Sequence, residues 1–420
     1  MRIALLTVNV YDNYGNTLQK YALYRTLEKF ADRVEVFWHH ASKQFTAYDL
    51  ELSPSFTGNV RASAFKCVRE NKFKEFDDTH MRTRFDLPDL EDVADDYDFF
   101  VVGSDQVWNP DLWVPGNFLE FAPPEKRIAY AASIAVPEVP ANLVDYYRAK
   151  ISEMPYVSIR EAEGVDLVEK ITGKRPLRVL DPVFLLDADE WREIAKPPRW
   201  LSRKTYENGY LLSYFFDGKP PEQVRALADK LNLPVVNLLD LNNFDQYITG
   251  IEEFLYLVDH ATLMCTQSFH GTAFAINFKT PVIVYKVQIG RMVQRFSRLE
   301  SLLGLFGLSD RATDVDLELK MEDPLQIDFT RRDEAIVAER TKALTFLKVA
   351  LGLLPQDELP IEPPKPEELP PVIEEPVTEE SATEEPAQDE LPPEDTPQVE
   401  TSEADESSQV ESSEVTDNEN

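Results

Sequence analysis

The sequence predicts an α/β fold of two consecutive doubly wound domains, closed by a C-terminal helix. Short apolar, β-branched runs alternate with amphipathic stretches, as they do in parallel βα units. This alternation occurs twice, before and after a polar connection. The length of 420 residues also suits two or three domains. Two such domains should face a cleft, and ligands of open α/β sheets bind beyond the carboxyl ends of the strands.

The N-terminal domain is expected over residues 1–187. Apolar runs predict its strands, and the stretches between them predict its helices. Residues 42–95 fit no simple βα unit and are treated as an insertion of uncertain structure. The expected strands are Ile3–Val8, Val34–Phe37, Phe99–Val102, Ile128–Ala131, Val157–Ile159 and Leu177–Leu180, and the expected helices are Thr17–Phe30, Ala141–Ser152 and Gly164–Thr172.

The second domain is expected over residues 206–330, after a linker at 188–205. A helix over 331–354 should pack on the body, because its apolar residues recur on one face. The expected strands are Tyr210–Tyr214, Val235–Leu238, Thr262–Thr266 and Val282–Tyr285, and the expected helices are Pro221–Leu231, Ile251–Val258 and one that opens near Ser268.

Residues 355–420 are expected to form a disordered acidic tail. They are rich in Pro, Ser, Thr, Asp and Glu, contain Lys365 as their one basic residue, and lack aromatic residues. Such a segment cannot bury enough apolar surface to offset the entropy of ordering. The tail carries much of the net charge of −33.

The composition also excludes several classes of function. An acidic body argues against nucleic acid as the main partner, since phosphate binding needs clustered Lys and Arg. Two cysteines, Cys67 and Cys265, indicate a reducing compartment. The N-terminal apolar run is too short for a signal peptide, and no apolar stretch reaches the roughly 18 residues of a membrane span. We therefore expect a cytoplasmic protein.

Two loops after strands of the first domain are candidate binding sites. Asn13 and Gly15 lie between the first strand and the first helix, where a glycine lets backbone approach a ligand and a helix N-terminus favours an anion. The alternative is an ordinary tight turn. Ser104 and Asp105 follow the strand Phe99–Val102, where they could bind a substrate hydroxyl or transfer a proton. The alternative is that they cap a helix or a turn.

Two further loops carry charged or titratable groups. Arg160 ends an apolar strand and suits a bidentate grip on carboxylate or phosphate, or else an ion pair with Glu161 or Glu163. His270 stands with Ser268, Gly271 and Thr272 in the sequence TQSFHGT, after a strand and at the start of a helix. Backbone N–H groups at a helix start form an anion-binding site, and the imidazole can donate a proton.

Other kinds of site find no support in the sequence. There is no CxxC pair, HExxH motif, Walker loop or GxGxxG, so we expect neither a metal nor a nucleotide cofactor. A basic stretch could contact an anionic lipid carrier, although a solvated helix face is the favoured interpretation. Its members are Arg61, Lys66, Arg69, Lys72 and Lys74.

Six segments in order resemble the polysaccharide pyruvyl transferase family. They are DNYGNTLQKYAL at 12–23, FVVGSDQVWNP at 100–110, YAASI at 130–134, VSIREAEGVDLVEKITG at 157–173, VLDPVFLLDADEW at 179–191 and TQSFHGTAFAINFKTPVIV at 266–284. The resemblance implies a double-Rossmann, glycosyltransferase-like architecture. It also makes Arg160 similar to the family's anion-binding arginine and His270 similar to its essential histidine. Several members carry an arginine where this chain has Ser268, so Arg291, Arg295 or Lys286 would have to supply that positive charge.

The resemblance implies transfer of the enolpyruvyl group of phosphoenolpyruvate onto two sugar hydroxyls of a polysaccharide or glycan precursor, forming a pyruvate ketal. Our hypothesis makes His270 the proton donor to the methylene carbon and Asp105 the acceptor of a hydroxyl proton. Whether the acceptor is lipid-linked and how the chain oligomerises stay open. A metal-independent glycosyltransferase with a nucleotide-sugar donor, or a non-catalytic scaffold, are the alternatives.

Overall fold

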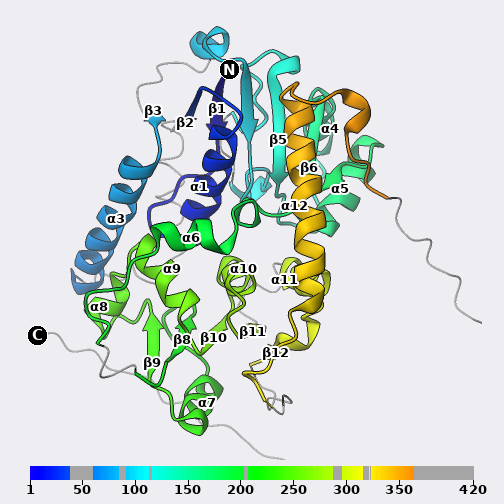
Figure 1. The fold of residues 1–420 in the computed structure, drawn as a ribbon. Helices are drawn as coiled ribbons and strands as arrows, with labels where there is room; N and C mark the ends of the chain where they lie inside the picture. The colour runs from blue at the N-terminus through cyan, green and yellow to red at the C-terminus, as the bar shows by residue number, and fades with distance from the viewer. Residues whose placement is uncertain are drawn as a thin grey trace, which may run out of the picture. The chain divides into compact units, whose positions relative to one another are not determined.

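The first sheet contains seven parallel strands in the order β3-β2-β1-β4-β5-β6-β7 (Figure 1). The computed structural model describes residues 1–37, 60–84, 91–112, 116–202, 207–286, 296–315, 321 and 323–363. The central strands are buried on both faces, which explains their unbroken apolar sequences. The strands are β1 (Arg2–Leu6), β2 (Arg33–Phe37), β3 (Thr83–Arg84), β4 (Phe99–Val102), β5 (Arg127–Ala132), β6 (Tyr156–Ile159) and β7 (Leu177–Arg178).

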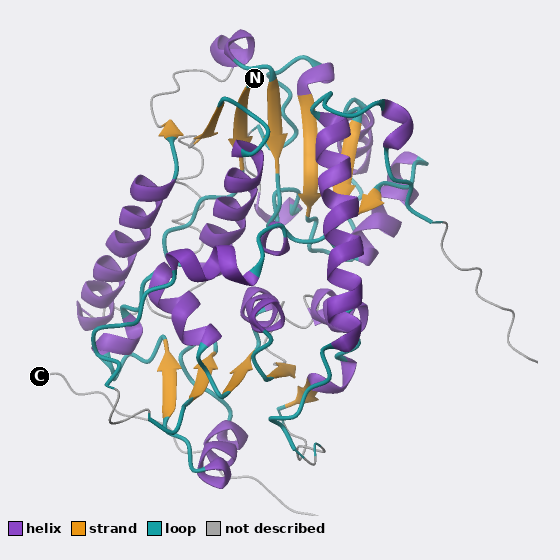
Figure 2. Cartoon of the chain, viewed as in Figure 1, coloured by secondary structure: helices purple, strands orange, loops and turns teal. Residues whose placement is uncertain are grey.

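The second sheet contains five parallel strands in the order β12-β11-β10-β8-β9. Helices alternate with the strands of both sheets along the chain (Figure 2). The predicted α/β class with two doubly wound sheets is thereby confirmed. The strands are β8 (Leu211–Tyr214), β9 (Val235–Leu238), β10 (Leu263–Thr266), β11 (Val282–Lys286) and β12 (Ala312–Asp314).

The core of the described residues consists of three apolar clusters, and the largest contains residues of helices from both sheets. Tyr14 at the start of α1 stacks on Phe254 of α9 with 4.3 Å between ring centroids, and its hydroxyl donates to the carbonyl of Thr249 at 2.7 Å. The main helices are α1 (Tyr14–Glu28), α3 (Val60–His80), α4 (Val144–Ser152), α5 (Ala162–Thr172), α6 (Ala188–Ile194), α7 (Glu222–Leu231), α8 (Phe244–Tyr247), α9 (Ile251–Asp259), α10 (Phe269–Phe278), α11 (Phe296–Leu305) and α12 (Thr330–Ala350).

The long helix α12 packs on elements of both sheets. Arg332 donates to the carbonyls of Ile276 and Asn277 at the end of α10. Further along α12, the Phe346 ring lies 6.3 Å from that of Tyr130 in β5. One helix thus ties the β10–β11 unit to the first sheet.

The strand order reverses once in each sheet. In the first sheet the reversal falls between the neighbours β1 and β4, and in the second between β8 and β10. At such a switch point the loops after the two strands diverge to opposite faces and leave a crevice at the carboxyl end. The topology therefore predicts that four loops form the binding site, namely those after β1, β4, β8 and β10.

Several predicted boundaries are corrected by the structure. Helix α1 begins at Tyr14 rather than Thr17, because the Asn13 side chain accepts the N–H of Asn16 at 3.1 Å and caps it. The linker contains α6, whose capping box joins Asp187 and Glu190 reciprocally. The described part of the insertion contains α3, β3 and the start of a 3-10 helix, Glu91–Asp96. The basic stretch, for which a helix face was the favoured interpretation, lies on α3, whereas β3 was not predicted.

The start predicted for the acidic tail is also corrected. Residues 355–363 are described and contact the first sheet: Tyr156 donates to Gln356 at 2.8 Å, and the Arg178 N–H donates to Glu362 at 2.8 Å. Leu359 packs against the core. These contacts order a segment whose composition alone suggested disorder, and the tail predicted from 364 onward lies outside the described residues.

Candidate active site

A cavity of about 240 Å³ lies at the two switch points. Asn13 and Asp105 reach it from the loops after β1 and β4, while Phe216 and Ser268 reach it from the loops after β8 and β10. All four loops designated by the topology therefore meet at one place. The remaining lining residues are Gln106, Gln267, Phe269, His270, Tyr285, Phe296, Arg298 and Leu299.

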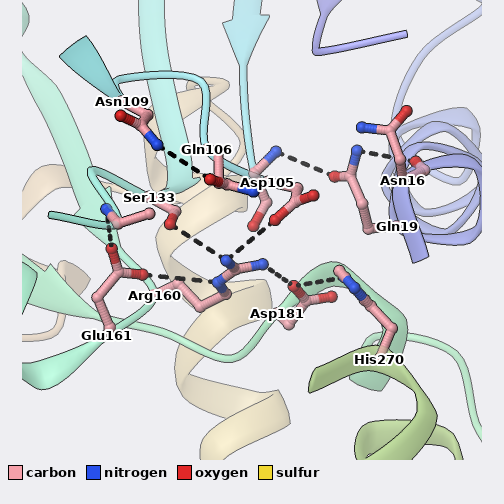
Figure 3. A network of polar contacts seen from close by, with 12 residues as sticks. Asn16, Gln19, Asp105, Gln106, Asn109, Ser133, Arg160, Glu161, Asp181 and His270 are labelled. Carbon is pink, nitrogen blue, oxygen red and sulfur yellow. Dashed lines mark hydrogen bonds and ion pairs between the residues drawn. The ribbon is translucent and has the colours of Figure 1, made fainter. Parts of the chain in front are cut away.

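A buried cluster of charges adjoins the cavity, with Arg160 at its centre (Figure 3). The guanidinium donates to Asp181 at 2.6 Å and to Asp105 at 3.2 Å, and its Nε lies 3.6 Å from Glu161. The Ser133 hydroxyl accepts a further N–H at 3.1 Å. Three carboxylates thus surround one arginine.

This arrangement sets the protonation of the cluster. Burial alone would raise the pKa of Asp105, but the positive charges of Arg160, His270 and Arg298 outweigh it and lower the pKa. The pKa of Asp181 is also lowered, because His270, Arg160 and the N–H of Val183 together outweigh burial. Burial would lower the pKa of Arg160, but its carboxylates raise it. Asp105, Asp181 and Arg160 are therefore ionised at neutral pH.

The structure places His270 beside this cluster. Its Nε2 lies 3.5 Å from the Asp181 carboxylate, an ion-pair distance, and makes no hydrogen bond among the described residues (Figure 3). His270 and Asp105, predicted as the catalytic pair, both line the cavity, with Asp181 and Arg160 linking them. The arrangement suits an imidazole that receives and releases a proton while a carboxylate stabilises its charged form.

Gly15 serves a different purpose from the one that its position suggested. The sequence indicated close approach of backbone to a ligand, yet Gly15 lies in the first turn of α1 and the group approaching it is His270. A Cβ atom at this position would stand 2.0 Å from His270 Nδ1. The glycine therefore makes room for the imidazole, and no reading of the first loop alone could show this.

The residues around Ser268 divide into two groups. Ser268 lines the cavity and is the N-cap of α10, its hydroxyl accepting the N–H of Gly271 at 3.2 Å. Gly271 and Thr272 are buried and do not line the cavity. A Cβ on Gly271 would approach Met264 and Thr266 of β10 to about 3 Å. Gly271 therefore fits α10 against β10, whereas the Thr272 hydroxyl donates to the carbonyl of Ser268 at 2.9 Å. Their contact with substrate stays a prediction.

Ser104 likewise stands away from the cavity surface. It is fully buried, its N–H donates to Gln19 at 3.0 Å, and its carbonyl accepts the N–H of Ser133. Its neighbour Gly103 has φ of +152°, and a Cβ there would overlap the Tyr130 carbonyl oxygen. The turn after β4 is thus tightly packed, and this packing fixes the position of Asp105, which lines the cavity.

Arg160 has the ion pair with Glu161 that was weighed as the alternative to anion binding. Its side chain is only 3% exposed and it does not line the cavity. Its role as an anion-binding residue stays a prediction, and the structure describes a ligand-free network in which its donors serve carboxylates of the chain.

Arg298, in α11, is the cationic side chain that sequence reasoning missed. It lines the cavity, is buried, and lies close enough to lower the pKa of Asp105. Lys286, one of the predicted substitutes, pairs with Glu300 at 2.7 Å. The other two, Arg291 and Arg295, lie outside the described residues. Asp181 was also missed, although it directly follows an expected strand, which is the signal that identified Asp105.

The basic stretch of α3 forms no free cationic face in the described structure. Lys66 pairs with Asp12 at 3.0 Å, Lys72 with Glu253 at 2.8 Å, and Lys74 with Asp78. Arg69 is buried over the ring of Tyr14. These contacts favour the structural interpretation of the stretch over binding of a lipid carrier.

The family of the chain follows from its similarity to known proteins. The model of the polysaccharide pyruvyl transferase family matches residues 13–288. The chain belongs to the polysaccharide pyruvyl transferase family. It is therefore a transferase, and the matched residues include Asp105, Arg160, Asp181 and His270. No curated protein sequence matches the chain.

Solved structures with a similar fold are distant in sequence. UGT89C1 of Arabidopsis thaliana, complexed with UDP-L-rhamnose, is 10% identical, with a TM-score of 0.42 over 85% of this chain and 99% of that one. UDP-GlcNAc 2-epimerase of Neisseria meningitidis is 11% identical, with a TM-score of 0.39 over 81% and 99%. MurG of Acinetobacter baumannii is 11% identical, with a TM-score of 0.35 over 84% and 94%.

The described residues lack two further features. They contain no group of three or more His, Cys, Asp or Glu placed to hold a metal ion. Within the same ranges, no helix is long and apolar enough to cross a bilayer.

Proposed function

We propose that this transferase moves the enolpyruvyl group of phosphoenolpyruvate onto two hydroxyls of a sugar in a polysaccharide or glycan precursor, forming a pyruvate ketal. The observation that carries the proposal is the convergence of His270, Arg298 and two helix N-termini on one cavity. Asn13 caps α1 and Ser268 caps α10, and both line it. Helix N-termini and a guanidinium favour an anion such as phosphate or carboxylate. Family membership supports the reaction type.

In the first step, His270 gives its proton to the methylene carbon of the donor, and positive charge develops at the carbon that carries the phosphate. Asp181 stabilises the charged imidazole beforehand, at 3.5 Å from Nε2. Positioned acid–base catalysis of this kind is worth about 10²–10⁴ in rate. The first sugar hydroxyl then attacks that carbon, and its oxygen forms the new C–O bond.

Asp105 accepts the proton of the attacking hydroxyl. Its lowered pKa makes it a weak base, which is sufficient because a hydroxyl bonded to a cationic carbon becomes strongly acidic. The bond from carbon to phosphate oxygen breaks, and phosphate leaves with the proton from Asp105. The second hydroxyl closes the ketal and returns a proton to His270. The scheme needs no cofactor.

The proposal is tested by phosphate release from phosphoenolpyruvate with a panel of glycan acceptors. We expect acceptor-dependent release by the wild type, at least 10²-fold slower release by His270→Ala, and a raised KM for phosphoenolpyruvate in Arg298→Ala. His260→Ala is the control, since that histidine is exposed on α9 and stacks on Tyr256. Full turnover in His270→Ala contradicts the mechanism, and absence of release with every acceptor contradicts the reaction.

A nucleotide-sugar glycosyltransferase is the second candidate, because one observation favours it. Phe216 is an exposed aromatic residue after β8 at this cavity, and an aromatic ring there could stack on a nucleobase. Thermal-shift measurements with phosphoenolpyruvate and with UDP-sugars separate the two donors, because a ligand that binds the folded chain raises its melting temperature, and at equal concentration the tighter ligand raises it more. Stabilisation by UDP-sugars alone would favour this second candidate.

A further inference from the structure

Phe216 differs from the phenylalanine that precedes it, Phe215, by its exposure. Phe215 is buried, with its ring 5.7 Å from that of Tyr285, so the core already has its aromatic residue at this strand end. Phe216 is 43% exposed and lines the same cavity as His270 and Asp105. A large apolar side chain left at the rim of a catalytic cavity is a candidate contact for an apolar surface of the substrate.

The Phe216 ring is supported from behind. It lies edge-on to Tyr214 with 5.7 Å between centroids, and Tyr214 in turn packs against Tyr14 and Phe254 at 5.6 and 5.7 Å. A ring held in this way presents a defined surface to the cavity and loses little conformational freedom when a ligand binds.

Phe244 shows what an ordinary exposed phenylalanine looks like in this chain. It is 41% exposed, nearly as much as Phe216, but its ring packs on Phe65 at 4.7 Å and it does not line the cavity. Single exposed apolar residues of this kind are common and carry no implication. Position at the cavity, not exposure alone, distinguishes Phe216.

The polar groups of the cavity comprise the hydroxyls of Ser268 and Tyr285 and two further chemical kinds. His270, Arg298 and Asp105 are charged or titratable, whereas Asn13, Gln106 and Gln267 are uncharged amides. An amide both donates and accepts hydrogen bonds, as a sugar hydroxyl does. Amides combined with an aromatic face suit a neutral polyol that also has a C–H surface, which is the chemistry of a sugar ring and not that of a small anion.

We propose that Phe216, with Gln267, forms the subsite for the acceptor sugar: the phenyl ring stacks on the C–H face of a pyranose while the amide binds its hydroxyls. This inference rests on the proposed pyruvyl transfer and extends it, since it assigns the acceptor to the second-sheet rim of the cavity. The donor anion then occupies the part near Arg298 and His270.

Steady-state kinetics with each substrate varied in turn tests this subsite. Phe216→Ala should raise the KM for the acceptor about 10-fold or more, the scale of a lost apolar contact, with the KM for phosphoenolpyruvate unchanged. Phe216→Trp should restore the acceptor KM, and Phe244→Ala should leave both constants unchanged. An unchanged acceptor KM in Phe216→Ala overturns the proposal.

A binding measurement separates this test from the fate of the proposed reaction. Saturation-transfer NMR on the full chain, with methyl glycosides of galactose, glucose and mannose as probes, requires no turnover. We expect signal from at least one glycoside in the wild type and in Phe244→Ala, and its loss in Phe216→Ala. Binding of UDP that is lost in Phe216→Ala, with no glycoside signal in the wild type, would assign the ring to a nucleobase and overturn the proposal.

Discussion

The two sheets contribute different chemistry to the same cavity. The first sheet supplies the fixed charges: Asp105 after β4, Arg160 after β6 and Asp181 after β7, bound to one another and buried. The second sheet supplies His270 at the start of α10 and the exposed ring of Phe216 after β8. One edge is mainly a buried network of ion pairs, from which only Asp105 among these charged residues reaches the cavity, and the other presents His270 and Phe216 to the cavity.

This difference indicates where the protein is sensitive to mutation. Buried ionised groups stabilise each other only as a set, so loss of one leaves the others uncompensated. Groups that face a cavity can be removed with little cost to folding, because water replaces them. We therefore expect the first edge to respond mainly in stability and the second mainly in activity.

The largest effect is expected from Arg160→Met. Asp105, Asp181 and Glu161 would remain buried without their shared cation, and the free energy of unfolding should fall by about 3–5 kcal/mol at neutral pH. Chemical denaturation measures it. As a control, Arg25→Met removes an arginine whose side chain is half exposed beside Glu28 and should cost less than about 1 kcal/mol. Equal costs in the two variants would refute the distinction between the edges.

Gly15→Ala should reduce activity with a smaller effect on folding. The added Cβ stands 2.0 Å from His270 Nδ1 and must displace the ring, and misplacement of a catalytic group by about 1 Å can cost 10²-fold in rate. The matched control is Gly304→Ala in α11, where the nearest atom to a new Cβ is 3.8 Å away. Measurement of kcat/KM for both variants tests whether only Gly15→Ala loses activity. A fully active Gly15→Ala enzyme would contradict the assigned contact.

Asp181→Asn should change the pH dependence of stability. The pKa of Asp181 is lowered in the folded chain, so its carboxylate stabilises the fold above the ordinary pKa of about 3.9, and this contribution is lost as the pH falls through the lower folded value. The deficit of the variant should be about 1.5–3 kcal/mol at neutral pH and should shrink below about pH 4. Thermal or denaturant unfolding at several pH values tests this, and a pH-independent deficit would argue against the assignment.

The smallest effects are expected from the two helix caps. Asn13 caps α1 on the first edge and Ser268 caps α10 on the second, each through one side-chain oxygen. Alanine at either position should cost about 1 kcal/mol of unfolding free energy. Similar values would show that the two edges differ in their charges and not in their helix starts. A much larger loss at one cap would mean that its side chain has a further structural role.

Local sequence was sufficient for the strands and for most of the loops that matter. β4 and β9 match their predicted bounds, since a buried parallel strand is an uninterrupted apolar run. Asp105 and His270 were found because polar residues directly after such runs stand at the carboxyl edge of a sheet. The strand β3 escaped prediction because two residues are too few for a pattern, and α11 was not predicted although Leu299, Leu302 and Leu303 lie on its buried face.

What the sequence by itself determined is thus the two-sheet fold, the loops at its carboxyl edges and the family. The tertiary structure alone decided which side chains contact one another. Arg160 bonds to Asp105 and Asp181, residues 55 and 21 positions away, and Gly15 makes room for His270. The physical reason is that local patterns report which face of an element is buried, whereas partners are set by strand order and by the packing of helices far apart in the chain. Arg298 likewise lines the cavity because of tertiary packing: it lies on α11, and no loop motif in the sequence indicated its position.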